Sequence, residues 1–272
     1  MEFGVIVGTE EEEFRRVAEL GIPTMQMWIK CTEDYLTDER LEHVKEYREK
    51  YNIRLSAAWC RWPGNPVWNL CEGQQTLGLV PIATRNERIK SMKLGADFSK
   101  KLGITDIVTH VGFIPENPMT TEYLGLVTDL RELAMYLKAN DQYLLFETGQ
   151  ETPVTLLRII EDIGTGNLGV NLDPANLYRY GKGNPIDALD VFGKYVRGVH
   201  IKDASSPTEG RTLGPELPIG QGDVNFPVFL DKLKNKVGYD GVLTFEREIE
   251  GERQTVELEE AKKFISDIWN SI

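Results

Sequence analysis

Four residues that can bind a metal or transfer a proton stand at or near the ends of short apolar segments. They are Glu147, Asp173, His200 and Glu246, in the segments YLLFE, GVNLD, RGVHI and VLTFE. A carboxylate or imidazole buried at such a point is costly to desolvate unless it is paired or binds a metal. Three carboxylates and one neutral imidazole suit a hard divalent ion better than a thiolate-seeking one. We therefore expect one divalent metal ion, with Mn²⁺ first and Mg²⁺, Co²⁺ or Zn²⁺ as alternatives.

Each of these four residues has a simpler interpretation when it is taken alone. A glutamate at a strand end is commonly solvated or caps a helix, and a single histidine in a strand is commonly a hydrogen-bonded core residue. All four recur at corresponding points of successive predicted strands, and this recurrence favours the metal site.

The segments that must position these residues alternate along the whole chain. Short apolar, β-branched segments predict strands at residues 2–7, 24–28, 54–59, 106–111, 143–147, 169–173, 197–201 and 242–246. Longer amphipathic segments predict helices at residues 10–20, 38–51, 85–102, 121–140, 154–163, 185–192, 226–236 and 254–269.

Eight strand–helix units in 272 residues leave about 34 residues for each unit. This alternation is typical of parallel strands joined by helices. We expect a (β/α)₈ TIM barrel that includes residues 1–272 as a single α/β domain. An open doubly wound sheet is the weaker alternative, because no Gly-x-Gly-x-x-Gly turn follows the first strand.

Two of the predicted connections are long, residues 60–84 after the third strand and residues 202–225 after the seventh. Reactive groups of a TIM barrel lie at the carboxyl ends of its strands, where the loops between strand and helix surround them. We expect these two loops to form mobile walls of a pocket.

The composition excludes several classes of protein. Lys and Arg number 31 against 43 Asp and Glu, for a net charge of −12, and no Lys/Arg-rich tract is present. Nucleic acids and anionic membranes require clustered positive charge, so neither partner is expected. The three cysteines form no C-x-x-C pair, which argues against a disulfide framework and a zinc–thiolate site. The chain has no signal-peptide pattern and no run of about 20 apolar residues, so we expect a cytoplasmic protein.

Four motifs in the carboxyl-terminal half resemble a known family. They are LDPAN at 172–176, HIKD at 200–203, GQGDVNF at 220–226 and FERE at 245–248. Together they resemble the xylose-isomerase-like sugar phosphate isomerase/epimerase superfamily, and within it the ketose 3-epimerase and inosose isomerase/dehydratase branches. The resemblance spans essentially the whole chain and is strongest from residue 106 onward. The motifs are specific for the superfamily but do not fix a substrate.

The resemblance implies roles for individual residues. In the epimerase branch a Glu, an Asp, a His and a second Glu bind one divalent ion, and here these are the four residues named above. Glu147 and Glu246 would also be the catalytic pair that transfers protons. A metal that polarises the ketose carbonyl would stabilise an enediolate, while one glutamate removes a proton and the other returns one to the opposite face. A single base that moves the proton between adjacent carbons would instead give aldose–ketose isomerisation. The family also implies a homodimer or homotetramer.

Two departures from the epimerase pattern bear on the reaction. Those epimerases carry a histidine three residues after the metal-binding aspartate, where this chain has Asn176. An amide can hydrogen-bond a substrate hydroxyl, but it cannot shuttle a proton near pH 7. The segment TGQE after Glu147 also differs from the Asn-Arg pattern of ketose 3-epimerases.

Further side chains are candidates for substrate contact. His110 ends the fourth strand and would face the pocket or make a core hydrogen bond. Lys202 would donate to a substrate oxygen if the strand continues past His200. Arg211, in the long loop, would hold a phosphate or hydroxyl or lie on the surface. Trp59 and Trp62 would stack on a sugar or pack in the core.

Two other functions compete with isomerisation or epimerisation of a sugar or polyol. A metal-dependent lyase or dehydratase acting on a keto-sugar, an inosose or an oxidised glycoside would begin with the same proton removal. An apurinic endonuclease is less favoured, because that chemistry uses three zinc ions and many histidines. This chain has only His43, His110 and His200, and His43 lies on a charged, solvent-facing helix.

Overall fold

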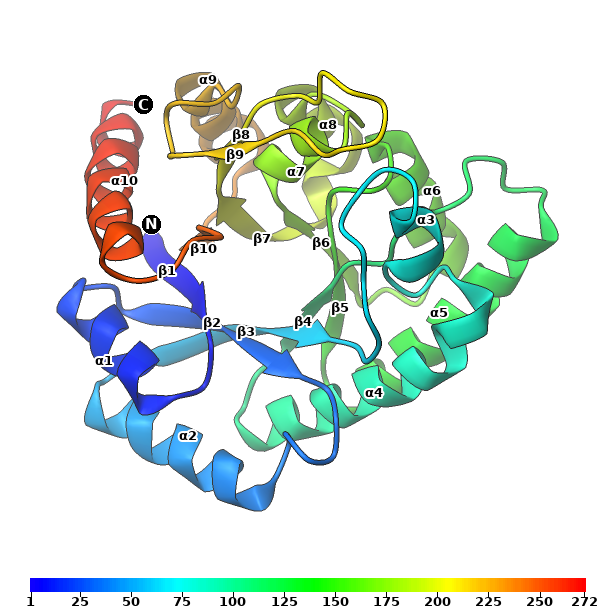
Figure 1. Ribbon diagram of the computed structural model, residues 1–272, viewed down its shortest axis with the longest axis horizontal. Helices are drawn as coiled ribbons and strands as arrows, with labels where there is room; N and C mark the ends of the chain where they lie inside the picture. Colours follow the sequence, from blue (N-terminus) through cyan, green and yellow to red (C-terminus); the bar gives the residue numbers. More distant parts are fainter.

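The structure is a computed structural model that describes residues 1–272, and its centre is a closed barrel of eight parallel strands (Figure 1). The barrel strands are β1 (Glu2–Val7), β2 (Thr24–Lys30), β3 (Arg54–Arg61), β4 (Asp106–Thr109), β5 (Tyr143–Glu147), β6 (Leu168–Leu172), β7 (Val196–Ile201) and β10 (Val242–Phe245). Each strand pairs with its sequence neighbours, and β10 closes the ring against β1. The predicted TIM barrel is confirmed.

Helices surround the barrel on its outer side (Figure 1). They are α1 (Glu11–Glu19), α2 (Asp38–Lys50), α3 (Gly73–Thr76), α4 (Ile82–Lys101), α5 (Thr121–Ala139), α6 (Pro153–Ile163), α7 (Pro174–Arg179), α8 (Pro185–Phe192), α9 (Phe226–Asp231) and α10 (Glu252–Ser271). None of them combines the length and apolar character that a membrane span needs.

Local sequence signals set the ends of these helices. The Thr152 side chain accepts a hydrogen bond from the Thr155 amide at the start of α6, and Pro153 takes the first helical position. Gly164 ends the same helix in the left-handed conformation, with φ of 64°. Such signals explain why most predicted elements lie within a few residues of the observed ones.

The structure differs from the prediction in two of the connections. Residues 174–179 form the short helix α7, because the Asp173 carboxylate caps it and Pro174 begins it. The predicted helix 226–236 is divided into α9 and a π-helical segment, Lys232–Val237. The long loop after β7 also contains the strand pair β8 (Asp203–Ala204) and β9 (Glu216–Leu217).

The inward-facing residues of the strands alternate with those that pack against the helices. A small apolar cluster of Ala57, Trp59, Val108 and Leu145 is separate from the large core under the helices. Trp59 of this cluster also lines a cavity at the barrel mouth. Because strand side chains alternate with a period of two, the residues two positions after Trp59, Val108 and Leu145 also point inward and lie at that mouth.

Candidate metal centre

The four predicted metal ligands meet at the carboxyl ends of four neighbouring strands. One donor atom from each of Glu147, Asp173, His200 and Glu246 lies within 4.8 Å of all the others. Glu147 ends β5 and His200 lies in β7, while Asp173 and Glu246 directly follow β6 and β10. The first three are buried, and the Glu246 side chain is 16% exposed toward the pocket.

The donor atoms fit a bound cation. Asp173 Oδ2, His200 Nδ1 and Glu246 Oε2 are buried and make no hydrogen bond. His200 Nδ1 lies only 2.8 Å from Glu246 Oε2 and 3.6 Å from Glu147 Oε1. Buried polar atoms almost always have hydrogen-bond partners, so three such atoms that lie close together without one fit a positive charge among them. One nitrogen and three carboxylate oxygens are suitable ligands for a divalent ion.

A glutamine outside the group of four orients the histidine. His200 Nε2 lies 2.7 Å from Gln26 Oε1, and Gln26 Nε2 lies 3.5 Å from Asn171 Oδ1. The Asn171 contact directs the amide oxygen of Gln26 toward His200, so Nε2 carries a proton and Nδ1 faces the three carboxylates. The sequence reasoning missed Gln26, although its position in the apolar strand TMQMWIK is a recognisable signal.

Burial and neighbouring opposite charges shift the pKa values of these residues in opposite directions. Burial alone would raise the pKa of the Glu147 carboxyl, but His110 and His200 outweigh it and lower that pKa. Burial alone would lower the pKa of His200, but Glu147 and Glu246 raise it well above its ordinary value. A proton on His200 and a divalent cation would each offset the negative charge of the same carboxylates, so the two would compete for this site.

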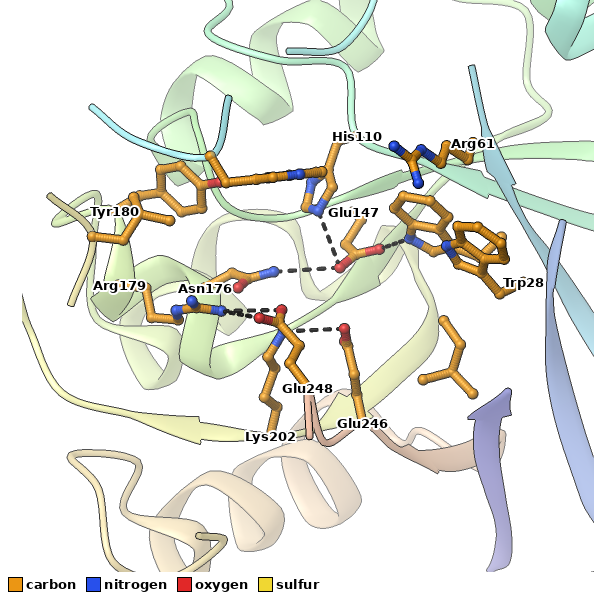
Figure 2. Close-up of a pocket in the computed structure, with 14 residues that line it drawn as sticks. Trp28, Arg61, His110, Glu147, Asn176, Arg179, Tyr180, Lys202, Glu246 and Glu248 are labelled. Carbon is orange, nitrogen blue, oxygen red and sulfur yellow. Dashed lines mark hydrogen bonds and ion pairs between the residues drawn. The ribbon is translucent and has the colours of Figure 1, made fainter. Parts of the chain in front are cut away.

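A cavity of about 280 Å³ is lined by two of the four residues, Glu147 and Glu246 (Figure 2). Three tryptophans line it, namely Trp28, Trp59 and Trp68, together with Tyr180. Cavities at the carboxyl face of a barrel are the usual place for a small-molecule substrate.

Three of the residues predicted to touch substrate hold the Glu147 carboxylate. His110 Nε2 lies 3.3 Å from Glu147 Oε1, and Asn176 Nδ2 donates to the same oxygen at 3.3 Å. The Trp59 indole N–H donates to Glu147 Oε2. Together they hold both oxygens of the Glu147 carboxylate in place. All three side chains also line the cavity, where they could contact a ligand.

Lys202 occupies the opposite wall, below the cavity in Figure 2. It lies two residues past His200, and its ammonium donates to Glu246 at 3.1 Å and to Glu248 at 2.5 Å. Burial alone would lower the pKa of Lys202, but the two glutamates raise it well above its ordinary value. Arg179 donates twice to Glu248, at 3.1 and 3.2 Å. The sequence analysis did not single out Arg179 or Glu248, although Glu248 ends the motif FERE.

Two other candidates do not reach the site. Arg211 is exposed and is absent from the residues that line the cavity, because its loop turns the side chain outward while its backbone carbonyl accepts a hydrogen bond from the Leu70 amide. Trp62 is a core residue whose indole N–H donates to Thr109 at 3.1 Å. His43 is exposed on α2, as predicted.

The motifs HIKD and GQGDVNF form one structural unit at the rim. The carboxylate of Asp203 accepts hydrogen bonds from the backbone amides of Ala204, Gly220, Gly222 and Val224, at 2.8 to 3.1 Å. A single buried aspartate therefore fixes both ends of the loop after β7.

Glu151 is a buried carboxyl group that the sequence analysis did not identify. It is 3% exposed, and neither of its oxygens makes a hydrogen bond. Burial raises the pKa of Glu151 to about 8, although Lys182 acts in the opposite direction. The side chain is therefore neutral at pH 7 and adds no negative charge near the centre.

Comparison with known proteins agrees with the fold and the motifs. The structure is similar to the crystal structure of a xylose isomerase domain protein from Planctomyces limnophilus, with 31% identity, 99% of this chain and 97% of that chain covered, and a TM-score of 0.90. It also shares its fold with a D-tagatose 3-epimerase-like protein, at 24% identity, 100% and 99% coverage and a TM-score of 0.73. An uncharacterized protein of Methanocaldococcus jannaschii is 25% identical, with 78% of this chain and 70% of that protein covered.

The model of the xylose isomerase-like TIM barrel family matches residues 14–268. This match includes both long loops, all four candidate ligands and every strand of the barrel except β1. The chain therefore belongs to the xylose isomerase-like TIM barrel family.

Proposed function

We propose that this chain is a divalent-metal-dependent isomerase or epimerase of a sugar or sugar phosphate. The observation that carries the proposal is the pair Glu147 and Glu246, whose carboxylates point toward each other across the cavity floor (Figure 2). Glu147, Asp173, His200 and Glu246 would hold the ion, with Mn²⁺ expected first and Mg²⁺, Co²⁺ or Zn²⁺ as alternatives. When bound, the ion would act as a Lewis acid on the substrate carbonyl.

The residues around the two glutamates are suited to proton transfer. One glutamate removes the proton from the carbon beside the carbonyl, and the electron pair of the broken C–H bond moves to the carbonyl oxygen. A proton returned by the other glutamate to the opposite face gives an epimer. An isomer forms if the first glutamate returns the proton to the former carbonyl carbon, while the proton of the neighbouring hydroxyl moves to the former carbonyl oxygen and that hydroxyl carbon becomes the new carbonyl. His110, 3.3 Å from Glu147, is placed to supply or hold a proton for that carboxylate.

A D₂O exchange experiment tests the proposal. Metal-loaded protein is incubated with ketoses, inososes and their phosphates, and NMR follows the loss of C–H signals. We expect exchange at a carbon next to the carbonyl for at least one compound. Glu147→Gln and Glu246→Gln should each reduce the rate by about 10³-fold or more, since each removes a proton-transfer group. Glu132→Gln, an exposed glutamate on α5, is the matched control and should exchange at the parent rate.

The products of the same experiment separate the reaction types. A configurational change at one carbon identifies an epimerase, and an aldose product identifies an isomerase. Loss of water or of another leaving group would identify the lyase alternative instead. The proposal fails if no compound exchanges, or if both variants retain bound metal and exchange as fast as the parent.

A further inference from the structure

We propose that Arg61 binds an anionic group of the substrate, so that the substrate is a sugar bearing a phosphate or a carboxylate. This inference rests on the proposed function, because it concerns the ligand of the same cavity. The anionic group would lie at the mouth, with the sugar carbons between it and the metal centre.

Arg61 is positioned by the strand that carries Trp59. It is the last residue of β3, two positions after Trp59, so both side chains lie on the inner face of the barrel. Its guanidinium lies 5.7 Å from the centre of the Trp28 ring. Figure 2 shows the guanidinium above Trp28, directed toward His110 and Glu147.

Arg61 differs from the other two cations of the cavity because it has no anionic partner. Lys202 and Arg179 both pair with Glu248. No carboxylate oxygen lies within 4.0 Å of the Arg61 guanidinium, although the chain has 43 acidic residues. Its only charge-related contact is with the face of Trp28. A planar guanidinium beside an aromatic ring, with its N–H donors free, is suited to two-point binding of a carboxylate or phosphate.

The charge balance of the site also favours an anionic substrate. Four carboxylates face or underlie the cavity: Glu147, Asp173, Glu246 and Glu248. With both histidines uncharged, the three cationic side chains and one bound divalent ion would together exceed these four negative charges by one positive charge. A neutral sugar would leave that charge uncompensated in a partly desolvated pocket, whereas a monoanionic group would neutralise it.

The size and walls of the cavity limit the rest of the substrate. A volume of about 280 Å³ is just below the usual range for small-molecule pockets, so a single sugar unit fits better than an oligosaccharide. The wall of Trp28, Trp59 and Trp68 can cover the apolar face of such a unit.

Binding measurements with matched compounds test the inference without any turnover. The probes are neutral ketoses, the same ketoses as 6-phosphates, and the corresponding keto-acids with a terminal carboxylate, each titrated into Mn²⁺-loaded protein. Tryptophan fluorescence and calorimetry report binding, because three tryptophans line the cavity. We expect one anionic class to bind about 10- to 100-fold more tightly than its neutral parent. The class that shows this gain identifies the group as phosphate or carboxylate.

Variants then assign the gain to Arg61. Arg61→Gln should abolish the preference for the anionic compound and leave the affinity for the neutral parent within about twofold, while Arg61→Lys should retain part of the preference. Arg211→Gln removes the same charge from an exposed site outside the cavity and should have no effect. The inference is overturned if neither anionic class binds more tightly than its parent, or if the preference persists in Arg61→Gln.

The outcomes separate this inference from the proposed function. Arg61-dependent binding of an anionic sugar without C–H exchange would support the anion site and contradict the proposed reaction. Exchange confined to neutral sugars, at equal rates in the parent and Arg61→Gln, would support the reaction and contradict the anion site.

Discussion

His200 depends on a residue that is 174 positions away in the sequence. Gln26 accepts the Nε2 proton and so leaves Nδ1 free to face the three carboxylates. Contacts of this kind fix the tautomer and the orientation of a ligating histidine, and they influence metal affinity although they do not touch the metal.

Replacing Gln26 tests this dependence. Gln26→Leu removes the acceptor for His200 Nε2 and should weaken Mn²⁺ binding by about 10- to 100-fold, measured by calorimetry on chelator-treated protein. Gln26→Glu keeps an acceptor oxygen at the same position and should bind Mn²⁺ more tightly than the leucine variant does. Equal affinities of the parent and Gln26→Leu would show that Gln26 has no positioning role.

The buried carboxyl of Glu151 makes stability depend on pH. Its pKa of about 8 in the folded protein lies above the ordinary value of 4.5, because burial disfavours the charged form. The stabilising contribution of the neutral group is complete below pH 4.5 and is lost as the pH rises through about 8. Glu151→Gln cannot ionise. Between pH 4.5 and pH 8.5, the difference in the free energy of unfolding between this variant and the parent should therefore change by about 2–4 kcal/mol in favour of the variant. Thermal unfolding at the two pH values measures this, and parallel pH profiles for the two proteins would contradict it.

The barrel strands and the loops after them have different roles at the scale of secondary structure. β5, β6, β7 and β10 bring four polar groups to one edge because parallel strands of a closed barrel end on the same side. The loops after β3 and β7 then add Trp68 and Leu213 to the cavity wall. The two loops also contact each other, through the hydrogen bond from the Leu70 amide to the Arg211 carbonyl.

The loop after β7 should depend on Asp203. Asp203→Ala removes the acceptor of four backbone amides and should lower the free energy of unfolding by about 2–4 kcal/mol, because these N–H groups, two of them buried at Ala204 and Val224, lose a charged partner. Limited proteolysis should cut the variant between residues 204 and 224 faster than the parent. Asp223→Asn is the control, since the exposed Asp223 accepts only from the Ser206 amide and should change little. Equal protease resistance of Asp203→Ala and the parent would exclude this anchoring role.

The four residues of the candidate metal centre come from four of the eight barrel strands, so an ion bound there should stabilise the molecule as a whole. An ion that binds only the folded chain raises its stability by about 2.7 kcal/mol at 100 times its dissociation constant. In a chain of this size that corresponds to an increase of roughly 5 °C or more in Tm.

A comparison of ions tests this effect and ranks the metals. Mn²⁺, Mg²⁺, Co²⁺ and Zn²⁺ are added separately to chelator-treated protein, and the increase in Tm is measured for each. We expect the largest increase with Mn²⁺. Asp173→Asn keeps an acceptor for the Asn176 amide at the start of α7 but removes a charged ligand, so its Tm should respond weakly. An equal response in the parent and this variant would place the ion elsewhere. An assembly of two or four copies remains a prediction, which light scattering on the same samples would address.

The barrel and the positions of its four central polar residues could be predicted from the sequence alone. Strand periodicity and helix amphipathicity depend on neighbouring residues, and a parallel barrel places every strand end on one rim, so these features can be recognised locally. Local signals also predicted that His110, Asn176 and Lys202 lie near the rim. The sequence did not predict α7, because its cap and its first turn could also be read as a loop.

The long side chains that enter the cavity could be identified from the three-dimensional structure but not from the sequence. Arg61 and Arg211 are both arginines at the edge of a long loop, yet the first lines the cavity and the second is exposed. The contacts that separate them, Arg61 on Trp28 and the Arg211 backbone on Leu70, join distant segments. Glu248 pairs with both Arg179 and Lys202, and Gln26 pairs with His200. The tertiary fold brings these partners together, since no local pattern encodes the partner of a long, flexible side chain.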